Sequence, residues 1–126
     1  MEVRSTRHSK YNINYHLVWI PKYRRPVLTE AVATHLAEIF HIIAEKKGIE
    51  ILSLEIMPDH IHLFVSSPPQ NAPSLLINWF KGISARMYNH RYDRPHIKWT
   101  NSYYVGTAGT VTSETIKRYI EGQKSK

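Results

Sequence analysis

The chain has 126 residues, which fits one domain around a single hydrophobic core. It contains no cysteine, which excludes disulfides, thiolate nucleophiles and cysteine zinc sites, and it has no apolar run long enough to span a membrane. Seventeen Lys and Arg against ten Asp and Glu give a formal net charge of +7, which points to a polyanionic partner or simply to a soluble basic protein.

The placement of the basic residues favours nucleic acid. They concentrate before residue 26 and again over residues 81–98, and in both segments they alternate with Tyr and Trp. Cations bind phosphates and aromatic rings stack on unpaired bases, so this mixture is typical of proteins that bind single strands. No membrane partner is expected, because no lysine-rich helix with a bulky apolar face is present.

The first half of the chain predicts a strand, a helix and two more strands. Residues 11–20 are rich in β-branched and aromatic residues, and the prolines of PKYRRP end this strand. A helix is expected over residues 29–47, because its apolar residues recur at helical spacing and Gly48 can cap it. Residues 49–57 and 60–65 predict two strands joined by a tight turn.

The second half predicts a long helix capped by Ser74, a short strand over residues 103–106 and a last helix from residue 112 or 113 through Gln123. The order strand, helix, strand, strand, helix, strand is the split βαββαβ pattern. The predicted fold class is therefore α+β and ferredoxin-like. Both central helices would cover one face of an antiparallel sheet, and an extra C-terminal helix would carry Tyr119.

The motif MPDHIHLFV, residues 57–65, places two histidines one residue apart in an apolar run. Because side chains alternate across a strand, His60 and His62 share one face, while Ile61 and Leu63 form the expected core face. Both imidazoles would then lie on the open face, close enough together to bind one divalent ion. Two histidines fall short of a closed zinc site, so a structural pair stays the alternative unless another element supplies a ligand.

The last predicted helix could supply that ligand. Tyr119 and Gln123 are four residues apart and share one helical face. Taken alone, they are a packed tyrosine and a solvated glutamine. Beside the histidine pair, they offer a phenol nucleophile and an amide oxygen. Imidazoles and a carbonyl oxygen suit Mn²⁺, and Mg²⁺ would be accepted if water filled the remaining positions.

Three blocks, HLVWIPKYRRPVL, MPDHIHLFV and SYYVGTAGTVTSETIKRYIEGQ, resemble the single-tyrosine HUH transposases of the IS200/IS605 insertion-sequence family. The match runs from about residue 15 to residue 123 in the family's order, and it implies a single HUH/Y1 transposase domain over residues 1–126. His60 and His62 match the family's metal ligands. Tyr119 matches the nucleophile, and Gln123 matches the polar residue that completes the metal site.

The resemblance also implies an activity. The family's members are metal-dependent transposases that bind hairpins at the ends of their element, cut one DNA strand and rejoin it. The implied cofactor is Mg²⁺ or Mn²⁺. The implied assembly is a homodimer whose active sites can be shared between subunits, and the implied location is the prokaryotic cytoplasm, at the nucleoid.

The expected chemistry is consistent with these residues. A phenol has a pKa near 10, so Tyr119 needs a base or a cation to become a good nucleophile. A metal would polarise the scissile phosphate, and attack by Tyr119 would give a 5′-phosphotyrosine and a free 3′-OH. That linkage keeps the phosphodiester energy, so a second 3′-OH can reverse the step without ATP. The group that accepts the phenol proton is left open.

Other residues have two interpretations each. Lys22, Arg24 and Arg25 could contact DNA phosphates or solubilise a loop, and we favour DNA contact. Tyr103 and Tyr104 are rival nucleophiles, for which packing or base stacking is the better interpretation. The aspartate of the Pro-Asp turn fits a turn residue, or a partner that orients a histidine ligand.

Three other functions have to be weighed. A domesticated relative would act as a nuclease on repeated genomic palindromes and would share the metal and tyrosine chemistry. A non-catalytic single-strand nucleic-acid-binding module of the same fold would need neither, but no strand carries the RNA-recognition signature. Histidine-triad hydrolases require a third alternating histidine, where this chain has Phe64.

Overall fold

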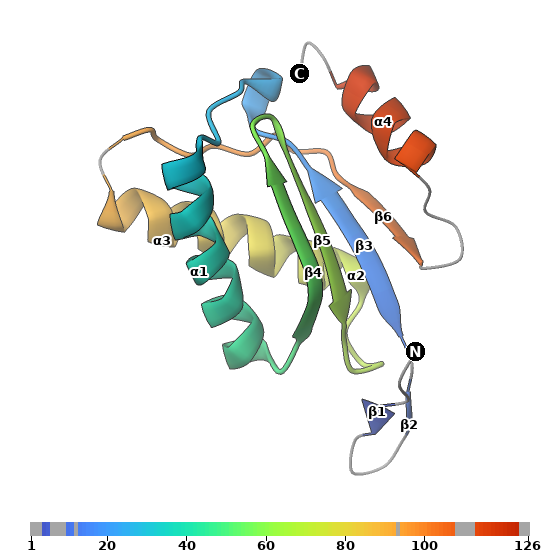
Figure 1. Ribbon diagram of the computed structural model, residues 1–126. Helices are drawn as coiled ribbons and strands as arrows, with labels where there is room; N and C mark the ends of the chain where they lie inside the picture. The colour runs from blue at the N-terminus through green and yellow to red at the C-terminus, as the bar shows by residue number, and fades with distance from the viewer. Residues whose placement is uncertain (1–3, 6–9, 12, 93, 108–112, 124–126) are drawn as a thin grey trace.

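The computed structural model describes residues 4–5, 10–11, 13–92, 94–107 and 113–123. At its centre is a four-stranded sheet in the order β4-β5-β3-β6, in which every strand is antiparallel to its neighbours (Figure 1). Its strands are β3 (Asn14–Trp19), β4 (Glu50–Met57), β5 (His60–Ser66) and β6 (Tyr104–Thr107). A separate pairing joins β1 (Arg4–Ser5) to β2 (Lys10–Tyr11).

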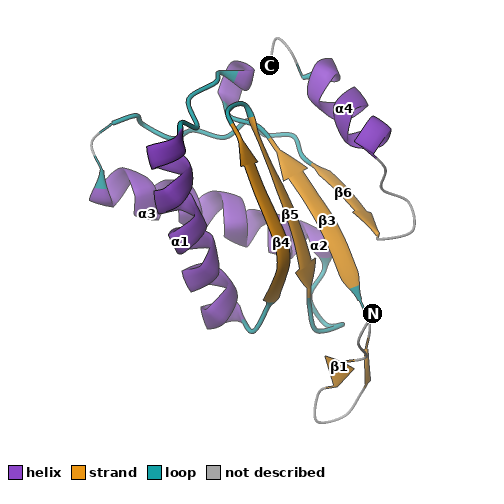
Figure 2. Ribbon diagram, in the orientation of Figure 1, coloured by secondary structure: helices purple, strands orange, loops and turns teal. Residues whose placement is uncertain are grey.

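Helices connect these strands (Figure 2). α1 (Glu30–Lys47) lies between β3 and β4, and α4 (Ser113–Gly122) follows β6. Between β5 and β6, the chain forms α2 (Pro73–Asn78), the π-helical turn η2 (Trp79–Ile83) and α3 (Ser84–Arg91). This order confirms the predicted ferredoxin-like α+β fold with an additional C-terminal helix. None of the helices in the described part of the chain is long and apolar enough to cross a membrane.

Most predicted boundaries agree with the structure, and the exceptions have local causes. α1 begins after Thr29, whose Oγ1 accepts a hydrogen bond from an amide of the first turn, and it ends at Gly48 with φ of 68°. The predicted cap at Ser74 is wrong, because the helix begins one residue earlier at Pro73, whose ring presets a helical φ.

The first strand of the sheet is also shorter than predicted. It begins at Asn14 because this residue pairs with Ser66, where β5 ends, and residues 10 and 11 pair with β1 instead. The long second helix is interrupted by a π turn. The strand predicted from residue 103 begins at Tyr104. The predicted helix start at residue 112 falls outside the described residues.

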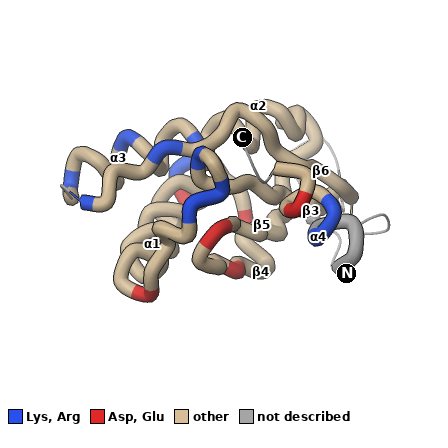
Figure 3. The backbone as a smooth tube through the Cα atoms, turned by 90° about the horizontal axis from the view of Figure 1, so that it is seen from above, with Lys and Arg blue, Asp and Glu red and all other residues tan. Residues whose placement is uncertain are grey.

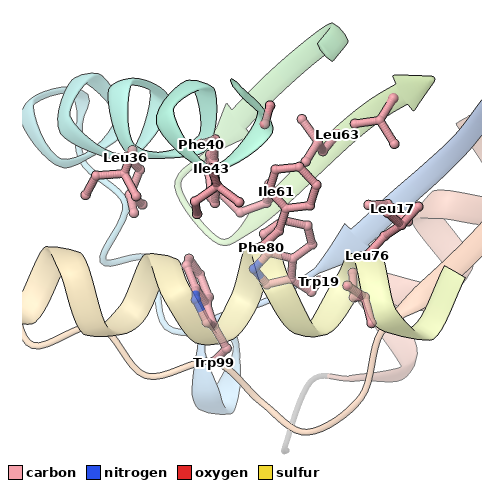
Figure 4. Close-up of a cluster of buried hydrophobic side chains, with 14 of the residues drawn as sticks. Leu17, Trp19, Leu36, Phe40, Ile43, Ile61, Leu63, Leu76, Phe80 and Trp99 are labelled. Carbon is pink, nitrogen blue, oxygen red and sulfur yellow. The ribbon is translucent and has the colours of Figure 1, made fainter. Parts of the chain in front are cut away.

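The hydrophobic core lies between one face of the sheet and α1, α2 and α3 (Figure 4). Trp19 is fully buried at its centre, with its ring 5.6 Å from that of Phe40 and 5.8 Å from that of Trp99, both edge-on. Strand β5 contributes Ile61 and Leu63 to this face, as the alternation in its sequence predicts. The opposite face of the sheet therefore carries the polar residues of β5.

The segment that leads into β6 is held by a single amine. The Nζ of Lys81, on η2, donates hydrogen bonds to the backbone oxygens of Thr100 (2.6 Å) and Ser102 (3.1 Å). Burial lowers the pKa of Lys81 to about 8. Lys81 thus fixes the backbone at Ser102, a residue that reappears in the candidate site.

We expect replacement of Lys81 by methionine to remove a pH-dependent part of the stability. Between pH 8 and 10.5 the unfolded chain keeps the lysine proton while the folded chain loses it, so the free energy of unfolding of the wild type gains on that of Lys81→Met as pH rises. The gain should be on the order of 1 kcal/mol after screening by solvent. Urea unfolding on both sides of pH 8 measures it, with Lys46→Met as the exposed control. Parallel stability profiles for the wild type and Lys81→Met would contradict the expectation.

Candidate active site

Strand β5 places the two predicted histidine ligands together on the open face of the sheet. His62 lies opposite Val18 of β3, and its Nε2 is 2.7 Å from Nδ1 of His16, so one ring donates a hydrogen bond to the other. The ring of His16 in turn stacks on Phe64, with centroids 4.1 Å apart. Adjacent strands thus contribute a packed row of rings, and His16 orients His62.

Burial favours the neutral form of His62 and His16. Burial lowers the pKa of His62, as does the neighbouring His60, while Glu55 on the paired strand raises it. Burial and the adjacent His62 also lower the pKa of His16. Neutral imidazole is the form that binds metals, so the surroundings of His62 favour coordination.

The turn between β4 and β5 supplies a carboxylate to the other histidine. Oδ1 of Asp59 is 2.9 Å from Nδ1 of His60, and Oδ2 of Asp59 is 3.7 Å from Nε of Arg24. A carboxylate on one ring nitrogen fixes the tautomer and leaves the other nitrogen available to a ligand. Both sequence-based interpretations of the Pro-Asp aspartate therefore fit, because it is a turn residue and it contacts His60.

Helix α4 brings Tyr119 to one hydroxyl that it shares with Gln123, the residue directly after the helix. The Oγ of Ser102 donates a hydrogen bond to Oε1 of Gln123 (2.9 Å) and lies 3.1 Å from the Tyr119 hydroxyl. Burial raises the pKa of Tyr119, and the hydrogen bond with Ser102 lowers it in part. The phenol is consequently protonated at neutral pH and has to lose its proton before it can act as a nucleophile.

Arg24 connects α4 to the histidine strand. Its Nη1 donates a hydrogen bond to the backbone oxygen of Ile120 (3.2 Å), one residue after Tyr119, while its Nε faces Asp59. A guanidinium can hold both partners because its donors are fixed in one plane. The contacts Ile120–Arg24–Asp59–His60 therefore link the tyrosine helix to the histidine pair.

The predicted residues thus form two groups with a bridge between them. In the described part of the chain, no hydrogen bond joins Gln123 to either histidine, and no set of three or more His, Cys, Asp or Glu side chains could hold a metal ion. Of the rival tyrosines, Tyr103 is 40% exposed, whereas the Tyr104 ring lies 6.3 Å from that of Tyr119, which fits a packing role.

Sequence reasoning missed two contributors and one role. His16 comes directly before the core residue Leu17, as His62 comes directly before the core residue Leu63. Because side chains alternate along a strand, this shared position could have placed both histidines on the open face. Ser102 offers no such signal, because its part depends on where α4 lies. Arg24 was predicted to contact DNA, together with Lys22 and Arg25, whereas the contacts it makes are with Asp59 and α4.

The chain is similar to known proteins over nearly its whole length. Residues 9–123 match the family model described as transposase IS200 like. The chain is 37% identical to the ISDra2 transposase TnpA of Deinococcus radiodurans, over all of this chain and 94% of the relative. It is 32% identical to the transposase for insertion sequence element IS200 of Salmonella typhimurium, over 95% of this chain and 82% of the relative.

Solved structures give the same assignment. The crystal structure of a candidate transposase from Deinococcus radiodurans R1 superposes with a TM-score of 0.81 at 35% identity, over 98% of this chain and 99% of that one. A REP-associated tyrosine transposase bound to a REP hairpin shares the fold, with a TM-score of 0.58 at 14% identity, over 94% of this chain and 69% of that one. The protein belongs to the family of IS200-like transposases, enzymes that cut and transfer DNA strands.

Proposed function

We propose that this transposase is metal-dependent and cleaves and rejoins single-stranded DNA at the hairpin-bearing ends of its element, through a 5′-phosphotyrosine on Tyr119. One observation carries the proposal. The phenol-bearing helix is tied by Arg24 and Asp59 to a histidine that shares the open face with a second one. A nucleophile and a pair of metal-binding groups are therefore attached to the same part of the fold.

The donor set fits a divalent cation. His60 and His62 are neighbours on one face, one ring is backed by the Asp59 carboxylate, and burial keeps the other neutral. With the amide oxygen of Gln123, they would hold Mg²⁺ or Mn²⁺. In the structure Oε1 of Gln123 accepts a hydrogen bond from Ser102, and a second lone pair of this oxygen is left for the cation.

The chain's own groups then carry the reaction. The cation, when bound, polarises the scissile phosphate and stabilises charge on the departing oxygen. Tyr119 Oη forms a bond to phosphorus as the bond from phosphorus to the 3′ oxygen breaks, while the phenol loses its proton and the 3′ oxygen gains one. Rejoining is the reverse, with a different 3′-OH as the attacking group. In the structure, Arg24 holds α4 beside the turn that carries Asp59.

Substrate and assembly follow from the family and the charge. A net charge of +7 suits a single strand and its hairpin, and a relative of the same fold is bound to a REP hairpin. We propose a homodimer in the prokaryotic cytoplasm, at the nucleoid. Active sites shared between subunits fit the attachment of α4, because the described contacts that hold its Tyr119–Gln123 end are three hydrogen bonds and one ring contact with Tyr104.

Two alternatives stay open to experiment. A nuclease acting on repeated genomic palindromes would form the same adduct on a different DNA, and its fold-level support is the hairpin-bound relative. A non-catalytic single-strand-binding module would bind DNA without a metal and without Tyr119. The experiment below separates that module from both enzymes.

We expect a covalent protein–DNA adduct that depends on a metal, on Tyr119 and on His62. Labelled single strands from the element ends are incubated with Mg²⁺ or Mn²⁺ and separated on a denaturing gel. Tyr119→Phe lacks the nucleophilic oxygen and His62→Ala lacks a ligand, so both should abolish the band, whereas EDTA should abolish it for the wild type.

Matched controls make the result specific. Tyr104→Phe removes the neighbouring hydroxyl and His41→Ala removes an exposed histidine of α1, and both variants should keep the adduct. Binding with no adduct under any metal would support the binding module. A band that survives Tyr119→Phe and is lost in Tyr104→Phe would transfer the nucleophile to Tyr104.

We also expect Ser102→Ala to shift adduct formation to higher pH. When the Ser102 hydroxyl turns its one proton from Gln123 to the phenolate, this hydrogen bond lowers the pKa of Tyr119, so its loss raises that pKa and leaves less phenolate at any given pH. The variant should therefore be slower near neutrality and approach the wild-type rate as pH rises. Rates of adduct formation against pH measure the shift. Ser102→Thr keeps the hydroxyl and serves as the control, and an unshifted Ser102→Ala profile would contradict the expectation.

A further inference from the structure

A basic hollow lies next to the candidate site, where the chain leaves β3. Its volume is about 310 Å³. We call it the η1 pocket because residues of the short 3₁₀ turn η1 (Lys22–Arg24) line it. Its lining consists of Pro21, Lys22, Tyr23, Arg25, Val27, His96 and Lys98. The volume is at the lower end of the range for small-molecule sites.

Two segments distant in sequence are fastened together to form it. Pro21 pairs with Trp99 in an isolated β-bridge, and the amide of Lys22 donates to the backbone oxygen of Lys98 (2.8 Å). The amide of Thr100 likewise donates to the oxygen of Ile20 (3.1 Å). These two hydrogen bonds form the bridge and set the spacing, so the side chains that line the η1 pocket are positioned by the fold.

The chemistry of the lining is that of an anion site with an aromatic wall. Lys22, Arg25 and Lys98 are cations, and no acidic side chain is among the described lining residues. Tyr23 is 52% exposed, with the Lys22 amine 5.6 Å and the Arg25 guanidinium 5.3 Å from its ring centroid. Figure 3 shows Lys and Arg along α3 and in the middle of the view, with Asp and Glu mainly on α1 and near β4.

The backbone at Tyr23 is strained in a way that serves this arrangement. Tyr23 and Arg24 have φ of 62° and 52°, in the left-handed region that non-glycine residues seldom adopt. Such strain costs on the order of a few kT per residue and persists where the surroundings enforce it. The turn sends Tyr23 to the pocket and Arg24 to Asp59 and α4. One turn therefore connects the η1 pocket with the candidate active site.

We propose that the η1 pocket binds one unpaired nucleotide of the DNA strand, with its base stacked on Tyr23 and its phosphate among Lys22, Arg25 and Lys98. The inference rests on the proposed function for the presence of DNA. An exposed tyrosine ring flanked by cations suits a base and its phosphate, whereas a paired duplex does not offer the face of a base. Through Arg24, the bound nucleotide lies one residue from the contact that holds the tyrosine helix.

The test measures binding rather than chemistry. Fluorescein-labelled oligothymidylate and an abasic strand of the same length are titrated with Tyr119→Phe protein in EDTA, and anisotropy gives the dissociation constants. Tyr23→Asn removes the ring but tolerates the left-handed backbone. It should weaken oligothymidylate binding about 5- to 150-fold, the range for one stacked base, and leave abasic binding unchanged. Tyr23→Phe should bind as the parent protein does.

Charge is tested separately. Lys98→Ala should weaken binding of both strands and reduce the salt slope of log K by about 0.7, the value for one phosphate contact on a single strand. Lys46→Ala, at an exposed position of α1, should leave the slope unchanged.

Three results would overturn the inference: equal binding by Tyr23→Asn and its parent, an equal loss on both strands, or displacement of oligothymidylate by inorganic phosphate as effective as that by thymidine monophosphate. The last would indicate an anion site without stacking. Failure of the proposed function is distinguishable, because it is a lack of adduct in the wild type. If the wild type forms the adduct and Tyr23→Asn binds oligothymidylate as tightly as its parent, the proposed function stands and only the nucleotide site in the η1 pocket is refuted.

Discussion

The structure depends on a sheet whose core face is covered by α1, α2 and α3, while α4 meets the other face at Tyr104. Because strand side chains alternate, residues such as Leu17 and Trp19 lie under the three core helices, and their neighbours lie on the opposite face. In β5, Ile61 and Leu63 are fully buried while His60 and His62 face away. A one-residue slip of β5 would bury both imidazoles, so the packing of the core also fixes the position of the histidine pair.

The strained backbone at Tyr23 and Arg24 places side chains that contact distant parts of the chain. A left-handed backbone at two consecutive residues is unfavourable in isolation, and here it directly follows residues 20–22, which are linked through the backbone to residues 98–100. The result is a turn whose side chains diverge, one set toward a basic hollow and one toward Asp59 and Ile120. Glycine at either position would relieve the strain but would also remove a side chain that the site uses.

Periodicity sufficed to predict most of the fold and half of the site. The apolar spacing of α1 and the alternation in β5 are local properties, so the sequence alone predicts which residues are core and that His60 and His62 share the open face. The contacts of Ser102 and Arg24 are not local, since they span 17 to 96 positions along the chain. Local sequence patterns do not predict which residues make such distant contacts. The π turn over Trp79–Ile83 likewise has no simple sequence signature.

The manner in which α4 is attached has a consequence for the energy landscape of the protein. None of its described side chains belongs to the hydrophobic core, and its described end is held by Ser102, by Arg24 and by a ring contact with Tyr104. Each hydrogen bond of this kind contributes about 1 kcal/mol net, against about 5–15 kcal/mol for a whole domain. The three contacts named here therefore contribute a small part of the stability of a domain. The free energy of binding a single nucleotide is of the same order as these contacts, so binding beside Arg24 can offset their loss.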